Sequence, residues 1–378
     1  MRTRADGPIV LPIGSKFELG VLDVGQLAES IELAPFVETL GFSRYWVSEH
    51  HGAGLIANPQ LMVGILAGVT SRIRVGTGGV LLRFHSPLAV LETFRLLQLL
   101  ALGRADMGIA RSPADTAALN AALLDGRPTA YSSDDHAAKI AELQRLSKPL
   151  ESTDPLFGHI DGAPKDLPPP ELWVLSTSHE GAKIAAKLGA RYAFHDFYAP
   201  TLGPDSVKRY FDEFKPSADL TAPQCTVCLD AFVADDEGTA KAVRLSHHAK
   251  ENREGRRVFC GNQAQFSDHL EQMATAYQCR EVLLSTLWGG GNSTAQFRSF
   301  ELAKATADLL NNKTEPSPET KAGLSSKFGG DLLLRSYFSA SLLPPSMQLI
   351  PPATVSVAAG VRTFRRLTLS WRAIFFMG

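Results

Sequence analysis

The stretch TSRIRVGTGGVLLRFHSPLAVLETFRLLQLLALGRADMGIAR, residues 70–111, contains two apolar runs separated by a segment with helical periodicity. The runs at 73–82 and 105–111 are typical of buried strands, and Pro87 suits the first turn of the helix between them. No hairpin turn signal separates the two runs. A strand, a helix and a second strand in this order predict a parallel pair joined by a crossover helix.

The same alternation continues along the chain, apart from a polar and less regular stretch after residue 111. Further strands are predicted at 17–23, 44–51, 171–177, 190–195, 224–234 and 281–288, and helices at 27–40, 59–70, 134–147, 179–189 and 294–310. Eight strand–helix steps favour an α/β fold of the closed (β/α)8 TIM barrel type. An open doubly wound sheet is the alternative, but it needs a glycine-rich turn after the first strand, where VLDVGQLAES has a single glycine.

The composition of the chain excludes several classes of protein. The chain has 378 residues, 38 Lys and Arg against 39 Asp and Glu, and four cysteines. The near-zero net charge gives no reason to expect nucleic acid or an anionic membrane surface as a partner. Neither an apolar run of membrane-spanning length nor the apolar core of a signal peptide is present, and the cysteines make no disulfide framework. These features predict a reduced, cytoplasmic protein.

Cys225 and Cys228 have the spacing of a metal knuckle or a redox dithiol. They lie in an apolar run predicted to be a strand, where residues three apart point to opposite faces. A zinc site would also need a second pair, and Cys260 and Cys279 are isolated. We therefore interpret Cys225 and Cys228 as packing cysteines.

Residues 313–378 differ in composition from the rest of the chain. The stretch 313–331 is rich in Pro, Gly, Ser and Lys and is typical of a linker, and an apolar, basic segment without steady periodicity follows it. We divide the chain into a barrel domain, 1–312, and a C-terminal extension of unassigned role. Docking of the extension on a partner or a membrane surface is the alternative.

Polar residues follow several of the predicted strands. In a barrel enzyme the active site lies where the carboxyl ends of the strands meet. The second strand ends in Ser48-Glu49-His50-His51, where a histidine can act as a general base or as a metal ligand, or the pair can be structural. Metal-dependent hydrolysis by His50, His51 and His195 is an alternative, but adjacent histidines lack the spacing of a strand ligand pair, so we predict no metal site.

Three further strand ends suit a flat, phosphorylated ligand. Gly78 and Gly79 are typical of a bulge or of a ligand that lies against the backbone. Arg111 ends the fourth strand and adds a positive charge. Ser176-Thr177-Ser178 ends the fifth strand directly before a helix, where hydroxyl and backbone N–H groups bind anions. An ordinary N-cap at Ser178 is the alternative for the last of these.

The sequence blocks 40–51, LGFSRYWVSEHH, and 70–111, followed by 170–197, PELWVLSTSHEGAKIAAKLGARYAFHDF, resemble the bacterial luciferase-like flavin-dependent monooxygenases. The resemblance extends over about four-fifths of the chain and is closest to a branch of single-chain luciferase-like oxidoreductases. It implies a (β/α)8 barrel that binds reduced FMN or, in a sister branch, a deazaflavin coenzyme.

The resemblance also implies a reaction and its partners. Reduced FMN would come from a separate NAD(P)H-dependent flavin reductase, and O2 would oxygenate a small organic substrate through a C4a-hydroperoxyflavin. The resemblance allows a homodimer. A deazaflavin-dependent oxidoreductase and a non-catalytic flavin-binding barrel are the alternatives.

Carried onto this sequence, the resemblance assigns roles to single residues. His50 matches the first histidine of the family's Glu-His-His motif and is the implied catalytic base. Gly78 and Gly79 match the third-strand bulge that supports the isoalloxazine, which is often a non-proline cis peptide. Arg111 matches the arginine that reaches the phosphate.

The implied phosphate loop departs from the pattern of the family. Ser176, Thr177 and Ser178 match the loop, which often has the sequence Gly-Ser-Ser-Gly in this branch, but His179 and Glu180 follow them here. The side chains of His179 and Glu180 are expected to crowd or repel a phosphate. After the seventh strand and its helix, the charged, glycine-bounded stretch 247–262 predicts either a lid over the flavin or a solvated helix end and turn.

Overall fold

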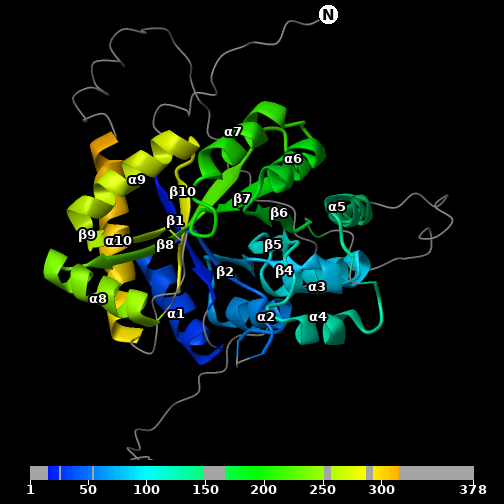
Figure 1. Ribbon diagram of the computed structural model, residues 1–378, viewed down its shortest axis with the longest axis horizontal. Helices are drawn as coiled ribbons and strands as arrows, with labels where there is room; N and C mark the ends of the chain where they lie inside the picture. Colours follow the sequence, from blue (N-terminus) through cyan, green and yellow to red (C-terminus); the bar gives the residue numbers. More distant parts are fainter. Residues whose placement is uncertain are drawn as a thin grey trace, which may run out of the picture. The chain divides into compact units, whose positions relative to one another are not determined.

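The computed structural model describes residues 16–24, 27–52, 55–128, 130–148, 167, 169–250, 257–286 and 293–314. Within this part of the chain strands and helices alternate, as Figure 1 shows. The strands are β1 (Glu18–Asp23), β2 (Arg44–Val47), β3 (Arg74–Thr77), β4 (Val80–Leu81), β5 (Ala105–Ala110), β6 (Glu171–Ser176), β7 (Arg191–His195), β8 (Cys225–Ala234), β9 (Val258–Asn262) and β10 (Glu281–Ser285). The helices are α1 (Leu27–Leu40), α2 (Pro59–Val69), α3 (Pro87–Leu100), α4 (Ala117–Leu124), α5 (Ser133–Ser147), α6 (His179–Leu188), α7 (Gly203–Glu213), α8 (Glu237–Lys250), α9 (Gln263–Tyr277) and α10 (Ser293–Thr314), with a short 3-10 helix, η1, at Leu82–Phe84.

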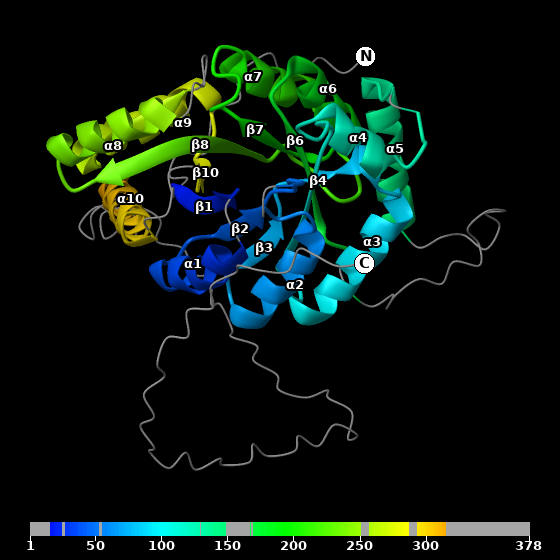
Figure 2. The same cartoon turned by 60° about the horizontal axis from the view of Figure 1, so that its bottom comes forward.

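Eight of these strands close into a parallel barrel. Neighbouring strands follow the order β10-β1-β2-β3-β5-β6-β7-β8, and the pairing of β8 with β10 closes the barrel. The short β4 also pairs with β5, whereas β9 pairs with the last five residues of β8. Figure 2 shows the helices arranged around the outside of the strands, and none of the described helices is long and apolar enough to cross a membrane. The predicted (β/α)8 barrel is confirmed.

The strands bury both of their faces, as parallel strands in a barrel do. One apolar cluster fills the interior of the barrel and includes Leu22, Trp46, Trp173 and Leu283. The rings of Trp46 and Trp173 meet edge to face with their centres 5.2 Å apart. A larger cluster lies between the sheet and the helices. The interior is therefore packed, and polar residues gather at the ends of the barrel.

Cys225 and Cys228 lie on opposite faces of β8. Cys225 belongs to the cluster between sheet and helices, and Cys228 belongs to the cluster inside the barrel. Both thiols are free and buried, and burial raises the pKa of each well above its ordinary value. Since the two side chains point apart and neither forms a thiolate readily, their interpretation as packing cysteines is confirmed.

A buried network of charges closes the end of the barrel where the strands begin. Asp106 accepts hydrogen bonds from Arg44 at 2.6 Å, from Arg74 at 2.6 Å and from the Trp46 indole N–H at 2.8 Å. The Asp106 side chain is fully buried, and the Arg44 guanidinium lies 4.7 Å from the centre of the Trp173 ring. Arg44 and Arg74 begin β2 and β3, so the carboxylate on β5 ties three strands together.

The structure differs from the sequence prediction where strands end and helices are short. β2 ends at Val47, so the polar residues 48–51 form a connection rather than part of the strand. The strand predicted at 73–82 is divided into β3 and β4 by the two glycines between them. Helix α4 lies in the stretch that was predicted to be irregular.

Two predictions fall partly or wholly outside the described residues. In the stretch 247–262, α8 continues to Lys250 and β9 begins at Val258, so regular structure occupies both ends of the predicted loop. Residues 251–256 lie outside the described part of the chain. Residues 315–378 lie outside it as well, so the predicted domain boundary at residue 312 stays a prediction.

Candidate functional site

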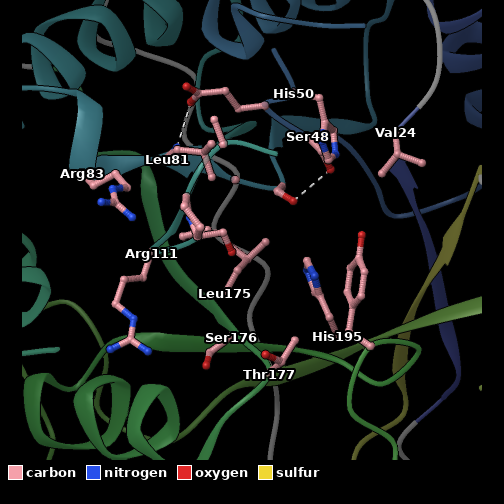
Figure 3. A pocket seen from close by; sticks show the side chains of 18 of the residues that line it. Val24, Ser48, His50, Leu81, Arg83, Arg111, Leu175, Ser176, Thr177 and His195 are labelled. Atoms are coloured by element: carbon pink, nitrogen blue, oxygen red, sulfur yellow. Dashed lines mark hydrogen bonds between the residues drawn. The ribbon is translucent and has the colours of Figure 1, made fainter. Parts of the chain in front are cut away.

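A pocket of about 700 Å³ lies at the carboxyl ends of the strands (Figure 3). All the residues predicted from the sequence line it: His50, Gly78, Gly79, Arg111, Ser176, Thr177 and Ser178. They follow or end β2, β3, β5 and β6, which are neighbours in the barrel. The parallel topology therefore brings distant parts of the sequence to one site. Residues that the sequence did not predict also line the pocket, among them Ser48, Glu49, Arg83, Asp115 and Tyr131.

Gly78 and Gly79 form a bare stretch of backbone in the wall of the pocket. The peptide bond between them is cis. A Cβ on Gly78 would lie 2.4 Å from a methyl carbon of Leu22, and a Cβ on Gly79 would lie 2.8 Å from the Gly108 carbonyl oxygen. The Ser48 hydroxyl donates a hydrogen bond of 3.1 Å to the Gly78 carbonyl. Since neither position has room for a side chain, only the peptide faces the pocket here.

Glu49 fixes the segment that follows these glycines. Its buried carboxylate accepts hydrogen bonds from the Leu81 N–H at 2.8 Å and interacts with Nε2 of His51 and of His85, both at 2.9 Å. Burial raises the pKa of Glu49, but hydrogen bonding and charge from His85, the Leu81 N–H and His51 together outweigh burial, so the pKa is lowered. The ionised Glu49 therefore holds the end of β2 against β4 and the turn after it.

His50 and His195 face each other across the pocket, as Figure 3 shows. Burial lowers the pKa of His50, an effect that Asp115 and Glu49 offset only in part. Burial, and after it the nearby His50, lowers the pKa of His195 to about 4. Both imidazoles are therefore neutral at pH 7 and able to accept a proton. Nε2 of His195 is buried without a hydrogen-bond partner among the described residues.

The Ser176-Thr177-Ser178 loop leads into the N-terminus of α6. Ser178 is the N-cap of this helix, and its hydroxyl accepts a hydrogen bond from the Gly181 N–H at 3.3 Å. The Ser176 hydroxyl lies 3.1 Å from the Ser178 hydroxyl. A Cβ on Gly181 would lie 2.0 Å from the Ser176 oxygen, so the loop can fold back on the helix because residue 181 is glycine. The N-cap interpretation of Ser178 is confirmed, and the capped helix end lines the pocket.

His179 and Glu180 do not crowd this loop, contrary to that part of the expectation from the sequence. Nδ1 of His179 lies 2.9 Å from the Ser206 hydroxyl on α7. Glu180 is about half exposed and lies 3.8 Å from Lys183 on its own helix. Neither is among the described residues that line the pocket. Both side chains occupy the first turn of α6, where side chains project outward while the backbone N–H groups face the helix end.

Arg83 and Arg111 lie on the side of the pocket opposite His195 (Figure 3), and Tyr131 also lines the pocket. Arg111 donates a hydrogen bond to the Ser133 hydroxyl at the start of α5. The Arg83 guanidinium lies 5.6 Å from the centre of the Tyr131 ring. This side of the pocket suits an anionic group.

The described residues include no group of three or more His, Cys, Asp or Glu placed to hold a metal ion. Nε2 of His51 lies 2.9 Å from Glu49, which also binds His85 and the Leu81 N–H. Metal-dependent hydrolysis by His50, His51 and His195 therefore has no support in this part of the chain.

Comparisons with known proteins identify a matching family model and similar proteins. Residues 15–281 match the model of the luciferase-like monooxygenase family. The protein YwcH of Bacillus subtilis (strain 168) is 30% identical over 296 residues, which cover 69% of this chain and 88% of YwcH. A luciferase-like monooxygenase of Escherichia coli (strain K12) is 33% identical over 221 residues, 58% of this chain and 64% of that protein. The crystal structure of apo-MsnO8 has a TM-score of 0.69 at 28% identity and covers 78% of this chain and 99% of MsnO8.

Two more distant solved structures share the fold. The oxygenating constituent of 3,6-diketocamphane monooxygenase from Pseudomonas putida, solved with FMN, has a TM-score of 0.58 at 16% identity and covers 78% of this chain and 98% of its own. An F420-dependent secondary alcohol dehydrogenase, solved with an F420–acetone adduct, has a TM-score of 0.59 at 15% identity. The match covers 78% of this chain and 99% of the dehydrogenase. At these identities the likeness extends to the fold alone.

Proposed function

The chain belongs to the luciferase-like monooxygenase family, and from this premise we propose that it is a flavin-dependent monooxygenase that oxygenates a small organic substrate with reduced FMN and O2. The observation that carries the proposal is one pocket that joins the bare Gly78-Gly79 peptide, a neutral His50 and the hydroxyl-lined N-terminus of α6. The bare peptide suits a flat ring, the neutral imidazole suits proton transfer, and the helix N-terminus suits a phosphate.

The residues of the pocket fit FMN. A volume of about 700 Å³ is within the range of cofactor sites. The Gly78-Gly79 peptide offers a wall without side chains to the isoalloxazine. At the other strand ends, Arg111 and the Ser176–Ser178 loop would hold the phosphate, since charge-assisted and helix-terminal N–H donors favour anions.

In the proposed reaction the protein positions, protects and moves a proton. Reduced flavin, when bound, supplies the chemistry that activates O2. His50 is neutral at pH 7, so its imidazole can accept a proton from the substrate or the cofactor. The Ser48 hydroxyl donates a hydrogen bond to the Gly78 carbonyl, and Glu49 accepts one from the Leu81 N–H in β4, so the wall beside His50 is fixed by ordered hydrogen bonds. We propose that a separate NAD(P)H-dependent reductase supplies the reduced flavin.

The second candidate is a deazaflavin-dependent oxidoreductase. It is supported by the fold that this chain shares with the F420-dependent alcohol dehydrogenase. Titration with FMN and with F420, followed by turnover with a flavin reductase under 18O2, tests both. The proposal expects FMN binding and 18O in the product. Binding of F420 with hydride transfer that needs no O2 would favour the second candidate. Flavin binding without turnover of any substrate would favour a non-catalytic barrel.

Arg111→Ala is expected to weaken FMN binding about tenfold or more and to leave riboflavin binding unchanged. The reason is that a charge-assisted hydrogen bond to the phosphate has no counterpart in riboflavin, which lacks that group. Dissociation constants from quenching of flavin fluorescence measure both effects in one assay. Equal losses for the two ligands would mean that Arg111 supports the fold through Ser133 and does not bind the phosphate.

We also propose a homodimer, because large apolar side chains are exposed on two neighbouring helices. Leu61 on α2 is 64% exposed, and Leu99 and Leu100 on α3 are 57% and 62% exposed. The two helices pack against each other, so a twofold axis would bury the same surface of both copies. Light scattering after gel filtration is expected to give twice the monomer mass, and Leu99→Asp should give the monomer. Leu245→Asp on α8, where Leu245 is 63% exposed, is the matched control and should leave the mass unchanged; a monomeric parent would contradict the proposal.

A further inference from the structure

The pocket contains a second arginine that the proposed function does not yet use. Arg83 lies in η1, directly after β4, and lines the pocket together with Arg111. Because β4 pairs with β5 with Leu81 opposite Ala110, the residues that follow these positions stand on neighbouring strand ends. Figure 3 shows the two arginine side chains on the same side of the pocket, opposite His195.

The segment 131–133 contacts both arginines. The Arg83 guanidinium lies 5.6 Å from the centre of the Tyr131 ring, and Arg111 donates a hydrogen bond to Ser133, two residues further along the chain. The Tyr131 hydroxyl lies 3.1 Å from Nδ1 of the buried His136, which fixes the ring. Burial, and after it Asp135, raises the pKa of Tyr131 to about 12, so the phenol adds no negative charge beside the guanidinium groups.

We propose that Arg83 and Arg111 hold the flavin phosphate between them, and that Arg83 makes the pocket select the phosphomonoester of FMN over flavins with one negative charge or none at this position. This inference rests on the proposed flavin function. A phosphomonoester carries nearly two negative charges at neutral pH, and guanidinium groups bind phosphate oxygens through paired donors.

The other groups at the phosphate end do not supply this selection. The Ser176–Ser178 hydroxyls are neutral donors, and the N-terminus of α6 is equivalent to about half a positive charge. A lone Arg111 beside them suits a monoanion as well as a dianion. A second guanidinium on the same side of the pocket is the feature that favours the doubly charged group.

Three ligands with the same ring system test this selection: FMN, riboflavin 5′-sulfate and riboflavin, whose 5′ groups carry two, one and no negative charges near neutral pH. Dissociation constants from flavin fluorescence are measured for the parent and for Arg83→Met. We expect the parent to bind FMN about tenfold more tightly than the sulfate. The reason is that the second negative charge of the phosphate strengthens a charge-assisted hydrogen bond from Arg83. Arg83→Met should reduce this preference to about twofold and leave riboflavin binding unchanged.

Two control variants separate local contacts from charge alone. Arg83→Lys keeps the charge but loses the planar pair of donors, so an intermediate preference is expected. Arg72→Met removes an exposed charge next to the start of β3, at the opposite end of the barrel, and should change nothing. If Arg83→Met also lowers the thermal midpoint, the comparison is made with Arg83→Lys.

The outcomes distinguish this inference from the function on which it rests. A full preference for FMN over the sulfate in Arg83→Met, with loss of it in Arg111→Met, would overturn the role of Arg83 and leave the flavin function intact. If the parent binds the sulfate as tightly as FMN, the selection itself is overturned. If the parent binds none of the three flavins, the proposed function fails and this inference fails with it.

Discussion

Replacing His50 with alanine is expected to lower the yield of oxygenated product per reduced FMN by about 10²–10⁴-fold, the usual contribution of a positioned acid–base group. Folding and flavin binding should change little, because the imidazole projects into the pocket and not into either apolar cluster. The measurement couples the purified protein to a flavin reductase and counts product against flavin oxidised. Product formation equal to that of the parent would remove His50 from the mechanism.

The pH dependence of the parent gives a second test of His50. Burial lowers the pKa of His50 below the ordinary value of about 6.5 for an imidazole, despite the opposing charges of Asp115 and Glu49. A base with a lowered pKa stays deprotonated further into the acid range. The yield should therefore hold from pH 8 to about pH 6.5 and fall only at lower pH. A fall that begins well above pH 6.5 would point to another base.

His179→Ala is the matched control for the His50 variant. His179 also follows a strand end, but its imidazole lies 2.9 Å from the Ser206 hydroxyl on α7 and is not among the described residues that line the pocket. Removing it should leave the product yield close to that of the parent. A comparable loss in both variants would mean that histidine removal acts through stability and not through chemistry.

The eight strands of the barrel could be predicted from the sequence because strands buried on both faces appear as continuous apolar runs. Helix α4 could not, since its sequence AALNAALL has no polar face and Leu124 is its one fully buried residue among those described. Strand β9 was missed for a related reason: it pairs with the end of β8, where Val258, Phe259 and Cys260 are only partly buried. Weak burial leaves weak periodicity.

The site could be predicted as far as it depends on strand ends. His50, Gly78, Gly79 and Arg111 stand at or just after apolar runs, and the parallel topology brings such positions together. Arg83 and Tyr131 lie in a one-turn helix and in a connection, which apolar patterning does not place. The signal available for Arg83 was a charged residue inserted directly after the apolar run GVLL, shortly before the helix-starting Pro87.

The positions of His179 and Glu180 show the limit of arguing from residue type alone. A histidine and a glutamate in place of glycines suggested a crowded phosphate loop, but both side chains lie outside the pocket because α6 begins at His179. The glycine that the loop does need is Gly181, in the first turn of the helix, where the Ser176 hydroxyl occupies the space of a side chain. The departure from the usual loop sequence is therefore compatible with an anion at the helix end.

Asp106→Asn is expected to destabilise the fold by about 3–5 kcal/mol, the largest stability effect predicted for this chain. The carboxylate is fully buried and accepts hydrogen bonds from Arg44, Arg74 and the Trp46 indole N–H. An amide of the same shape would leave two guanidinium groups without their shared anion, and one of these, on Arg44, is itself buried. Urea unfolding followed by tryptophan fluorescence measures the loss.

Asp235→Asn provides the matched control for Asp106→Asn, because Asp235 pairs with Arg298 at the same distance of 2.6 Å but both side chains are at least half exposed. An exposed pair contributes about 1 kcal/mol or less.

The charge network around Asp106 lies at the end of the barrel where the strands begin, opposite the pocket. Asp106→Asn protein that is still folded should therefore bind FMN with the affinity of the parent. A loss below about 1 kcal/mol would show that Glu281 and Glu171, which also pair with Arg44 and Arg74, are enough to stabilise the two arginines. A loss of FMN affinity in the folded variant would show that the two ends of the barrel are coupled. We do not expect this, because in a TIM barrel the end where the strands begin contributes to stability and the opposite end carries the active site.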